Sequence, residues 1–316
     1  MKQYTATAND DGVRLSRFVQ SVTRDFPTSL LYKSFRNKRV KVNGKKAAPE
    51  YRLQAGDLIE LYINDEFFPP EGAKPAVPKA APKKKQNQPK VIVIYEDENI
   101  AVLYKPTHLL CHSDRTGDAN LVDAFTQYLA EKGEYDPHGE NRFKPGVCNR
   151  LDRNTSGIVL AGKTLEGQQF LSDILRDRSA KKIYHCIVRG KVEEEMHLKG
   201  YLLKDERSNQ VQIFSDETQD AKPIETAYRP LVVGPDVTLL EVHLITGRSH
   251  QIRAHLASIG HPIAGDPKYG DMVWNKKLRQ NFSVRSQLLH AYSITLPDGR
   301  TFIADEPEIF SQIMRG

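Results

Sequence analysis

Apolar residues recur at helical spacing in two short segments near the start of the chain. Residues 14–24 place Leu15, Phe18, Val19 and Val22 three and four positions apart. Residues 28–37 repeat the pattern with other apolar side chains. Such spacings bring side chains onto one face of a helix, so the pattern predicts two consecutive helices.

Short apolar runs with turn residues between them come next. Val40 and Val42 alternate with Lys41 before Asn43-Gly44, a dipeptide that supplies the positive φ of a tight hairpin turn. Residues 58–63 follow Gly56-Asp57 and predict another strand. The runs 91–95 and 100–104 flank a polar turn and predict a second hairpin.

The remaining pattern predicts more strands than helices. Helical spacing covers residues 120–130, 164–176 and 249–259, and strand patterns cover 158–161, 183–188 and 237–245. The two kinds of element do not alternate regularly. We therefore expect an α+β fold with a mixed sheet rather than a doubly wound parallel sheet.

Residues 72–90 interrupt the pattern. They contain 6 Lys, 4 Pro and 4 Ala, and Val77 is their only large apolar residue, so they cannot bury enough surface to order themselves. A chain of 316 residues is long enough for two domains. We predict a small domain over residues 1–66, a linker over 67–90 and a larger domain over 91–316.

Composition favours a folded cytoplasmic protein. Hydrophobic residues make up 39% and charged residues 27% of the chain, and no apolar run approaches the roughly 20 residues that cross a bilayer. The first residues contain no apolar signal segment, and Cys111, Cys148 and Cys186 are too widely spaced for a disulfide framework. We expect no membrane association and a reducing compartment.

Charge is distributed unevenly along the chain. The net charge is +6, with +6 on residues 1–63, −3 on 64–71, +6 on 72–90 and −3 on 91–316. A basic first third attached to a slightly acidic body is typical of an anchor for a polyanion, and nucleic acid is the expected one. A solvated charged surface is the alternative.

Two familiar kinds of site are disfavoured. Residues 157–164, GIVLAGKT, match the phosphate-loop pattern, but their four central residues read as a strand, whose amides would be used in a sheet. Four histidines, at positions 243, 250, 255 and 261, have no cysteine pair or carboxylate to complete a metal-ligand set. We expect neither a nucleotide cofactor nor a metal, although a nucleotide hydrolase remains a rival hypothesis.

Two polar segments are candidates for chemistry. Asp152 lies between Arg150 and Arg153, whose charges favour its ionised form, and a turn follows directly before a strand. Such a carboxylate can act as a nucleophile or a base, or it can be an ordinary surface aspartate in an ion pair. The second segment, 244–255, ends a strand and opens a helix, and Arg248 lies at the junction, where anion sites are common.

The small domain resembles a known RNA-binding module. The order helix, helix, RVKVNGK, YRLQAGDLIELYI is similar to the αL motif at the front of many RNA-modifying enzymes, over about fifty residues. The resemblance implies a phosphate-facing side formed by Arg14, Arg17, Arg36, Lys38, Arg39 and Lys41.

The larger domain resembles an enzyme family. RLDRNTSGIVLAGKT, KKIYHCIVRG, LITGRSHQIRAHLASIGHPIAGDPKYG and LLHAYSITLP, in that order, are similar to the successive motifs of the RluA-type pseudouridine synthases. Lys105-Pro106 followed by His112 resembles a further family element. The resemblance implies a mainly antiparallel mixed-sheet catalytic domain that detaches uracil from its ribose in RNA, turns it and rejoins it through carbon. It implies no cofactor and no metal, and we expect a monomer.

The resemblance also implies roles for individual residues. Asp152 matches the catalytic aspartate, Tyr184 the tyrosine against the target base, and Arg248 the arginine that pairs with the aspartate. Breaking a glycosidic bond develops positive charge on the sugar, which one carboxylate can stabilise, capture or relieve by removing a proton. The remaining candidate substrate-binding residues are Lys182, Leu289, Arg150, His250 and Arg253.

The sequence departs from the family pattern at two places. Asn149 stands where the family usually has histidine, and Thr107-His108 replace a small residue followed by glycine. We expect large-subunit ribosomal RNA as the substrate, because the αL motif is usual among the family's ribosomal members. Transfer RNA is the alternative substrate, and a non-catalytic RNA-binding or ribosome-assembly factor is the alternative function.

Overall fold

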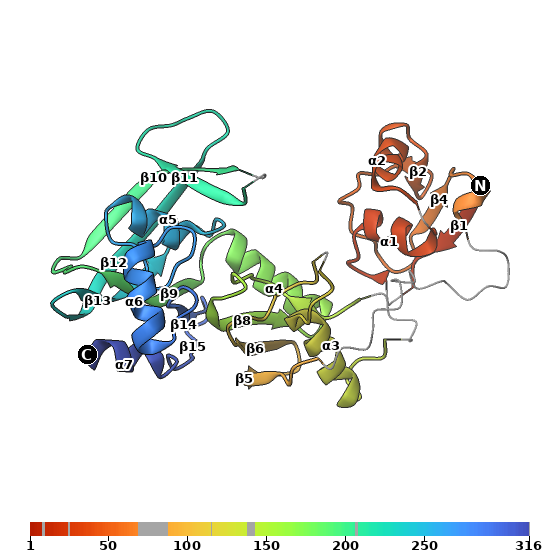
Figure 1. Cartoon of the computed structure of the whole chain (residues 1–316). Helices are drawn as coiled ribbons and strands as arrows, with labels where there is room; N and C mark the ends of the chain where they lie inside the picture. The colour runs from red at the N-terminus through yellow and green to blue at the C-terminus, as the bar shows by residue number, and fades with distance from the viewer. Residues whose placement is uncertain are drawn as a thin grey trace. The chain divides into compact units, whose positions relative to one another are not determined.

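The computed structural model describes residues 1–7, 10–24, 26–68, 88–114, 116–137, 143–205 and 208–315 (Figure 1). The chain divides into two compact units, residues 1–87 with 129–144 and residues 88–128 with 145–316. Most of the predicted linker, residues 69–87, lies outside the described residues.

The smaller unit packs two helices with an antiparallel sheet. Helices α1 (Leu15–Val22) and α2 (Thr28–Arg36) confirm the predicted pair, and α1 buries its four spaced apolar residues. The sheet has the order β1-β4-β2-β3, with bounds Lys2–Thr5, Leu58–Leu61, Val40–Val42 and Lys45–Lys46. Asn43 and Gly44 both have positive φ in the predicted hairpin turn, and a short 3-10 helix covers Asp65–Phe67.

One large sheet organises the second unit. Its path is β11-β10-β12-β13-β9-β14-β8-β6-β5, with β15 beside β14 and β7 beside β8. Among the described pairings between these strands only β8 with β14 is parallel, so the mixed, mainly antiparallel sheet is confirmed. The strand bounds are β5 Ile92–Glu96, β6 Ile100–Lys105, β7 Gly146–Val147, β8 Ser156–Gly162, β9 Lys181–Arg189, β10 Met196–Asp205, β11 Gln210–Phe214, β12 Lys222–Val233, β13 Val237–Leu244, β14 Leu289–Thr295 and β15 Thr301–Ile303.

Helices cover parts of this sheet (Figure 1). Helix α4 (Leu165–Arg176) packs Leu171 and Ile174 onto β6 and β8, and the Thr164 hydroxyl caps its first turn. Helices α6 (Met272–Phe282) and α7 (Ile309–Arg315) share a core with Ile187 of β9. Helix α5 (Gln251–Ser258) packs against β10 to β12, and α3 (Leu121–Glu131) follows the β6 hairpin. Within the described part of the chain, no helix has the length and apolarity needed to cross a membrane.

The glycine of the phosphate-loop pattern has a different role. Strand β8 is buried throughout and pairs with β6 and β14, so its amides are not available to cradle phosphates. Gly157 has φ +113°, and a Cβ there would lie 2.3 Å from the Ala291 carbonyl oxygen. Glycine is required because the parallel strands approach so closely.

Candidate active site

The loop before β8 presents Asp152. Thr155 N donates to the Asp152 carbonyl oxygen at 3.0 Å, which closes a turn. Leu160 N donates to Asn149 Oδ1 at 2.7 Å, so the asparagine that departs from the family pattern ties the loop to the strand. The second departure also has a backbone explanation, since His108 has φ +64°, a conformation in which glycine is unstrained.

A buried lysine holds the same loop from behind. Lys105, at the end of β6, is fully buried and donates to the carbonyl oxygens of Pro106, Leu109 and Arg153 at 2.9, 2.8 and 3.0 Å. Cys111 Sγ accepts from Leu151 N at 3.3 Å. These contacts fix the residues on both sides of Asp152. Burial lowers the pKa of Lys105 to about 8, although the nearby Cys111 and Asp152 favour its charged form.

Arg253 holds the Asp152 carboxylate. Its Nη1 donates to Asp152 Oδ2 at 2.7 Å, while its Nε and Nη2 donate to Asp266 Oδ2 and Oδ1 at 2.7 and 2.9 Å. The Asp266 side chain is completely buried and also accepts from the amides of Lys268 and Tyr269. Burial alone would raise the pKa of Asp266, but Arg253 lowers it. Asp266 therefore fixes the guanidinium that orients Asp152.

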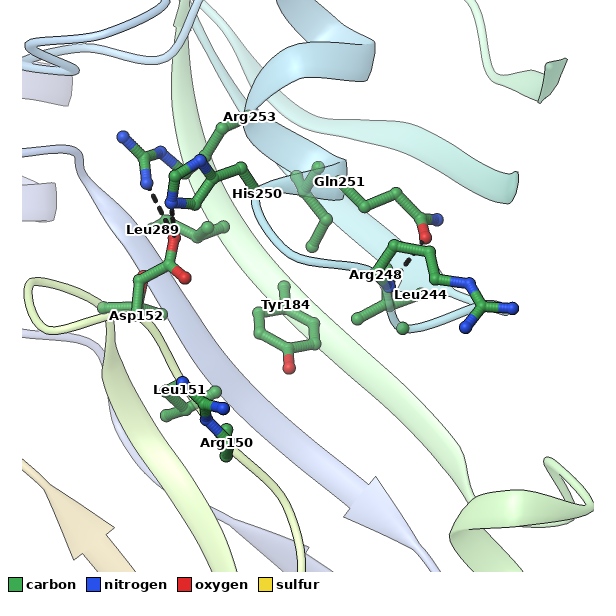
Figure 2. A pocket seen from close by; sticks show the side chains of 13 residues that line it. Arg150, Leu151, Asp152, Tyr184, Leu244, Arg248, His250, Gln251, Arg253 and Leu289 are labelled. Carbon is green, nitrogen blue, oxygen red and sulfur yellow. Dashed lines mark hydrogen bonds and ion pairs between the residues drawn. The ribbon is translucent and has the colours of Figure 1, made fainter. Parts of the chain in front are cut away.

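The predicted pair between Arg248 and Asp152 is wrong. Arg248 lines the same pocket, but Figure 2 shows its guanidinium directed away from Asp152. It lies before α5, whereas Arg253 projects from within the helix. Gln251 fixes the backbone there, since its Oε1 accepts from Arg248 N at 3.1 Å and its Nε2 donates to the Glu225 carbonyl oxygen at 3.1 Å.

His250 also faces the carboxylate. Its Nε2 lies 4.0 Å from Asp152 Oδ2, and its Nδ1 is 2.9 Å from the Tyr269 hydroxyl. Burial lowers the pKa of His250, although Asp152 opposes that effect. Neutral imidazole is thus favoured near neutral pH, and Tyr269 orients it. The turn 265–270 consequently supplies a partner to both side chains that touch Asp152.

The carboxylate, the tyrosine and apolar side chains meet in one pocket. It contains about 440 Å³ of empty space and is open to solvent. Tyr184 of β9 lies at its centre in Figure 2, with Leu289 of β14 and Leu244 of β13 beside it. Burial and the Asp152 charge raise the pKa of Tyr184, so its hydroxyl stays protonated. Arg150 lines the pocket as well, but Lys182 does not.

The second carboxylate oxygen of Asp152 is open. Arg253 and His250 both approach Oδ2, and no described residue donates a hydrogen bond to Oδ1, which points towards Tyr184 in Figure 2. Such an oxygen can act on a sugar carbon or a proton beside a base that lies against the Tyr184 ring. Within the described residues, no group of three or more histidine, cysteine or acidic side chains is placed to hold a metal ion.

Comparison with known proteins identifies the family. Residues 99–258 match the model of the RNA pseudouridylate synthase family. The ribosomal large subunit pseudouridine synthase C of Vibrio vulnificus is 31% identical over 90% of this chain and 84% of that protein. The protein of the same name from Escherichia coli K12 is 30% identical over 93% of this chain and 88% of that protein. The chain belongs to the RNA pseudouridylate synthase family.

Solved structures agree with the fold of this synthase. The human RNA pseudouridylate synthase domain containing 4 superposes with a TM-score of 0.58 at 21% identity, covering 71% of this chain and 92% of that one. The human RNA pseudouridylate synthase domain containing 1 superposes with a TM-score of 0.53 at 18% identity, covering 72% of this chain and 95% of that one. The predicted family, catalytic fold and synthase activity are confirmed; the roles of individual residues remain predictions.

Three residues that shape the synthase site carried no role in the sequence analysis. They are Asp266, Tyr269 and Lys105, which act on the carboxylate through other groups. The run GDPKYG at 265–270 was part of the quoted motifs, and an aspartate followed by proline and glycine is a turn signal. Neither feature indicates that the turn reaches Arg253 and His250.

The predicted phosphate-facing residues lie on the smaller unit. Arg14 and Arg17 are exposed at α1, and Arg36, Lys38 and Arg39 are exposed at and after the end of α2. The ammonium of Lys41 lies 5.1 Å from the centre of the Tyr62 ring. None of the six forms an ion pair with a residue that the structure describes, so their charges are available to a ligand.

Lys105→Met is expected to destabilise the synthase more at pH 10 than at pH 7. The variant leaves three buried carbonyl oxygens without their donor at both pH values. At pH 7 this loss is partly offset, because the wild type buries a charge; with a folded pKa of about 8, that cost disappears by pH 10. Between about pH 8 and 10.4 the unfolded lysine binds more protons, so wild-type stability rises with pH.

Urea unfolding of the wild type and Lys105→Met at both pH values measures this effect. We expect the difference in unfolding free energy between the two proteins to grow by about 2 kcal/mol from pH 7 to pH 10. Lys163→Met, which removes a lysine that donates to the Asp97 carbonyl oxygen and pairs with Glu96, is the control. If the difference in unfolding free energy is the same at pH 7 and pH 10, burial does not destabilise the charged form of Lys105.

Proposed function

We propose that this synthase isomerises uridines of large-subunit ribosomal RNA to pseudouridine, with Asp152 as the catalytic group. The observation that carries the chemistry is the Asp152 carboxylate, which Arg253 holds by one oxygen while the other faces the tyrosine pocket. The ribosomal target is supported by the names of relatives that are 30–31% identical over nearly the whole chain. The enzyme would act in the cytoplasm, where that RNA is made into ribosomes.

The pocket residues divide the work in this proposal. The target uridine leaves the stack, its base lies against Tyr184 and its sugar faces Asp152 Oδ1. Positive charge that develops on the sugar is stabilised by the carboxylate, or is captured by it in a covalent bond. Leu244 and Leu289 exclude water while the base turns. All these groups come from one chain, so a monomer suffices.

Mapping of pseudouridines in total RNA tests the proposal. Cells with and without the gene should differ at specific uridines of large-subunit ribosomal RNA, and the gene should restore them. The purified protein should form the same pseudouridines in protein-free large-subunit RNA. If the two cell types differ only in the pseudouridines of transfer RNA, the substrate is transfer RNA instead. If their pseudouridines do not differ at all, the non-catalytic alternative is favoured.

Neutralising the basic residues after α2 is expected to weaken RNA binding and its salt dependence. The triple variant Arg36→Ala, Lys38→Ala, Arg39→Ala removes three exposed charges without an acidic partner among the described residues. If all three contact phosphates, the slope of log K against log salt should fall by about 2 to 3. Filter binding at several salt concentrations measures it.

A matched triple variant of α6 provides the control. Lys276→Ala, Lys277→Ala, Arg279→Ala removes the same charge from an exposed helix of the larger unit. The single-turnover rate at saturating RNA should be unchanged by the variant of the smaller unit. Equal changes of slope in the two triple variants would contradict a specific anchor on the smaller unit.

A further inference from the structure

Three basic side chains gather at the end of the sheet where β9 begins and β13 ends. Arg178 precedes β9, Lys182 is the second residue of β9, and Arg248 follows β13. A Cβ on Gly247 would lie 3.9 Å from Lys182 Nζ, so this ammonium lies over the residue next to Arg248. We call Arg178, Lys182 and Arg248 the basic rim.

The basic rim has no counter-charge of its own. Within the described part of the chain, none of its three side chains forms an ion pair or a hydrogen bond with a carboxylate. Glu225 is nearby, but its carboxylate is 2.7 Å from His197 Nε2 and 3.6 Å from Lys199 Nζ. Lys182 is half-buried, and burial together with the charge of Arg178 lowers its pKa. A half-buried cation beside other cations is stabilised when an anion binds.

The basic rim lies between two hollows. Gly247 and Arg248 line the Asp152 pocket. Arg178 and Thr246 line a second hollow with about 740 Å³ of empty space, whose wall includes Tyr201 and Pro223. Since Thr246 and Gly247 are consecutive, the same turn lines both hollows. A chain that leaves the pocket can continue into the second hollow past the rim.

We propose that the basic rim binds the phosphodiester next to the target uridine. The inference rests on the proposed function, because the anion belongs to the RNA whose base enters the pocket. Taking a base out of its stack strains the backbone on both sides of it, and charge-assisted hydrogen bonds to an adjacent phosphate hold that geometry. Arg248 thus acts on the backbone of the substrate, and Arg253 on the carboxylate.

A double-mutant cycle, which combines a change in Lys182 with a change in one RNA phosphate, tests the contact between the basic rim and the flanking phosphodiester. Short RNAs carry the uridine that the wild type modifies, with a neutral methylphosphonate replacing in turn each of the two phosphates flanking that uridine and one phosphate five nucleotides away. Equilibrium binding is measured for the wild type and for Lys182→Met, which removes the charge and keeps the length of the side chain. Wild-type affinity should fall about tenfold at one flanking position. Lys182→Met should lose less than about twofold there.

Lys181→Met is the matched control. Lys181 is the neighbour of Lys182 on β9, and successive strand residues point to opposite faces, so it removes the same charge away from the pocket. It should keep the full tenfold response to the methylphosphonate. Equal responses of Lys182→Met and the wild type at both flanking positions would overturn the inference.

The short RNA without a methylphosphonate, the parent RNA, distinguishes a failure of the proposed function from a failure of the phosphate contact. Conversion of the parent RNA to pseudouridine by the wild type supports the proposed function whatever the outcome of the cycle. If the parent RNA is converted and Lys182 shows no coupling to either phosphate, the inference about the basic rim is refuted and the proposed function stands. If the wild type converts no RNA, the proposed function fails and the rim with it.

Discussion

Replacing Asp152 with asparagine is expected to abolish pseudouridine formation while RNA affinity changes by no more than a few-fold. The amide keeps the shape of the side chain, but it has no negative charge to stabilise or capture a sugar cation. We expect the single-turnover rate to fall by about a thousandfold or more. Arg253 keeps its two hydrogen bonds to Asp266, so the fold around the site should persist.

Asp118→Asn is the control for this change. Asp118 is an exposed aspartate that forms an ion pair with Arg153, the residue after Asp152. Its replacement also removes one negative charge beside the same loop, yet the rate should change little. Appreciable turnover by purified Asp152→Asn in a mapping assay would remove Asp152 from the catalytic role.

Arg253→Lys is expected to lower the single-turnover rate by about a hundredfold and to destabilise the protein. One ammonium cannot reproduce the three hydrogen bonds of the guanidinium to Asp152 and Asp266. The completely buried Asp266 would lose part of its compensation, at a cost of about 3 kcal/mol in unfolding free energy. The rate is measured with saturating RNA at a temperature where the variant is folded.

Arg248→Lys separates the two arginines of the same segment. It keeps a positive charge at the basic rim and touches neither aspartate, so its effect on the chemical step should be far smaller than that of Arg253→Lys. Weaker RNA binding with a nearly normal rate at saturation would fit a contact with phosphate. A larger loss of the chemical rate in Arg248→Lys than in Arg253→Lys would contradict the pairing described above.

The elements that the sequence predicted are those in which apolar spacing decides the structure. The predicted segments 14–24 and 158–161 have a clear helical or strand period because one face of the helix Leu15–Val22, and the whole of β8, is buried. Helix α6 was not predicted, since its core-facing stripe is narrow, Trp274, Leu278 and Phe282, and Met272 and Val273 are exposed apolar residues outside it. Strands β10 and β12 also escaped prediction because Gly200 and Thr226 occupy buried positions, which interrupts the alternation of large apolar residues, and β12 contains two prolines.

The motifs predicted most of the residues that meet in the pocket, Lys182 excepted, but not which arginine holds the carboxylate. Arg248 and Arg253 are five residues apart, and both follow a strand that ends at the pocket. The choice depends on the turn before α5, where His250 has φ +55° and the helix begins at Gln251. No periodicity indicates that turn, and the partner that fixes Arg253, Asp266, lies 13 residues further along.

The Asp152–Arg253–Asp266 group gives the pocket an electrical polarity. Two carboxylates and one guanidinium leave this group with one net negative charge, whereas the three side chains of the basic rim are cationic. A nucleotide has the opposite asymmetry, with a neutral base and an anionic backbone. This arrangement favours an orientation in which the anionic backbone lies at the basic rim and the neutral base faces Asp152. Orientation of the substrate then begins before any base-specific hydrogen bond forms.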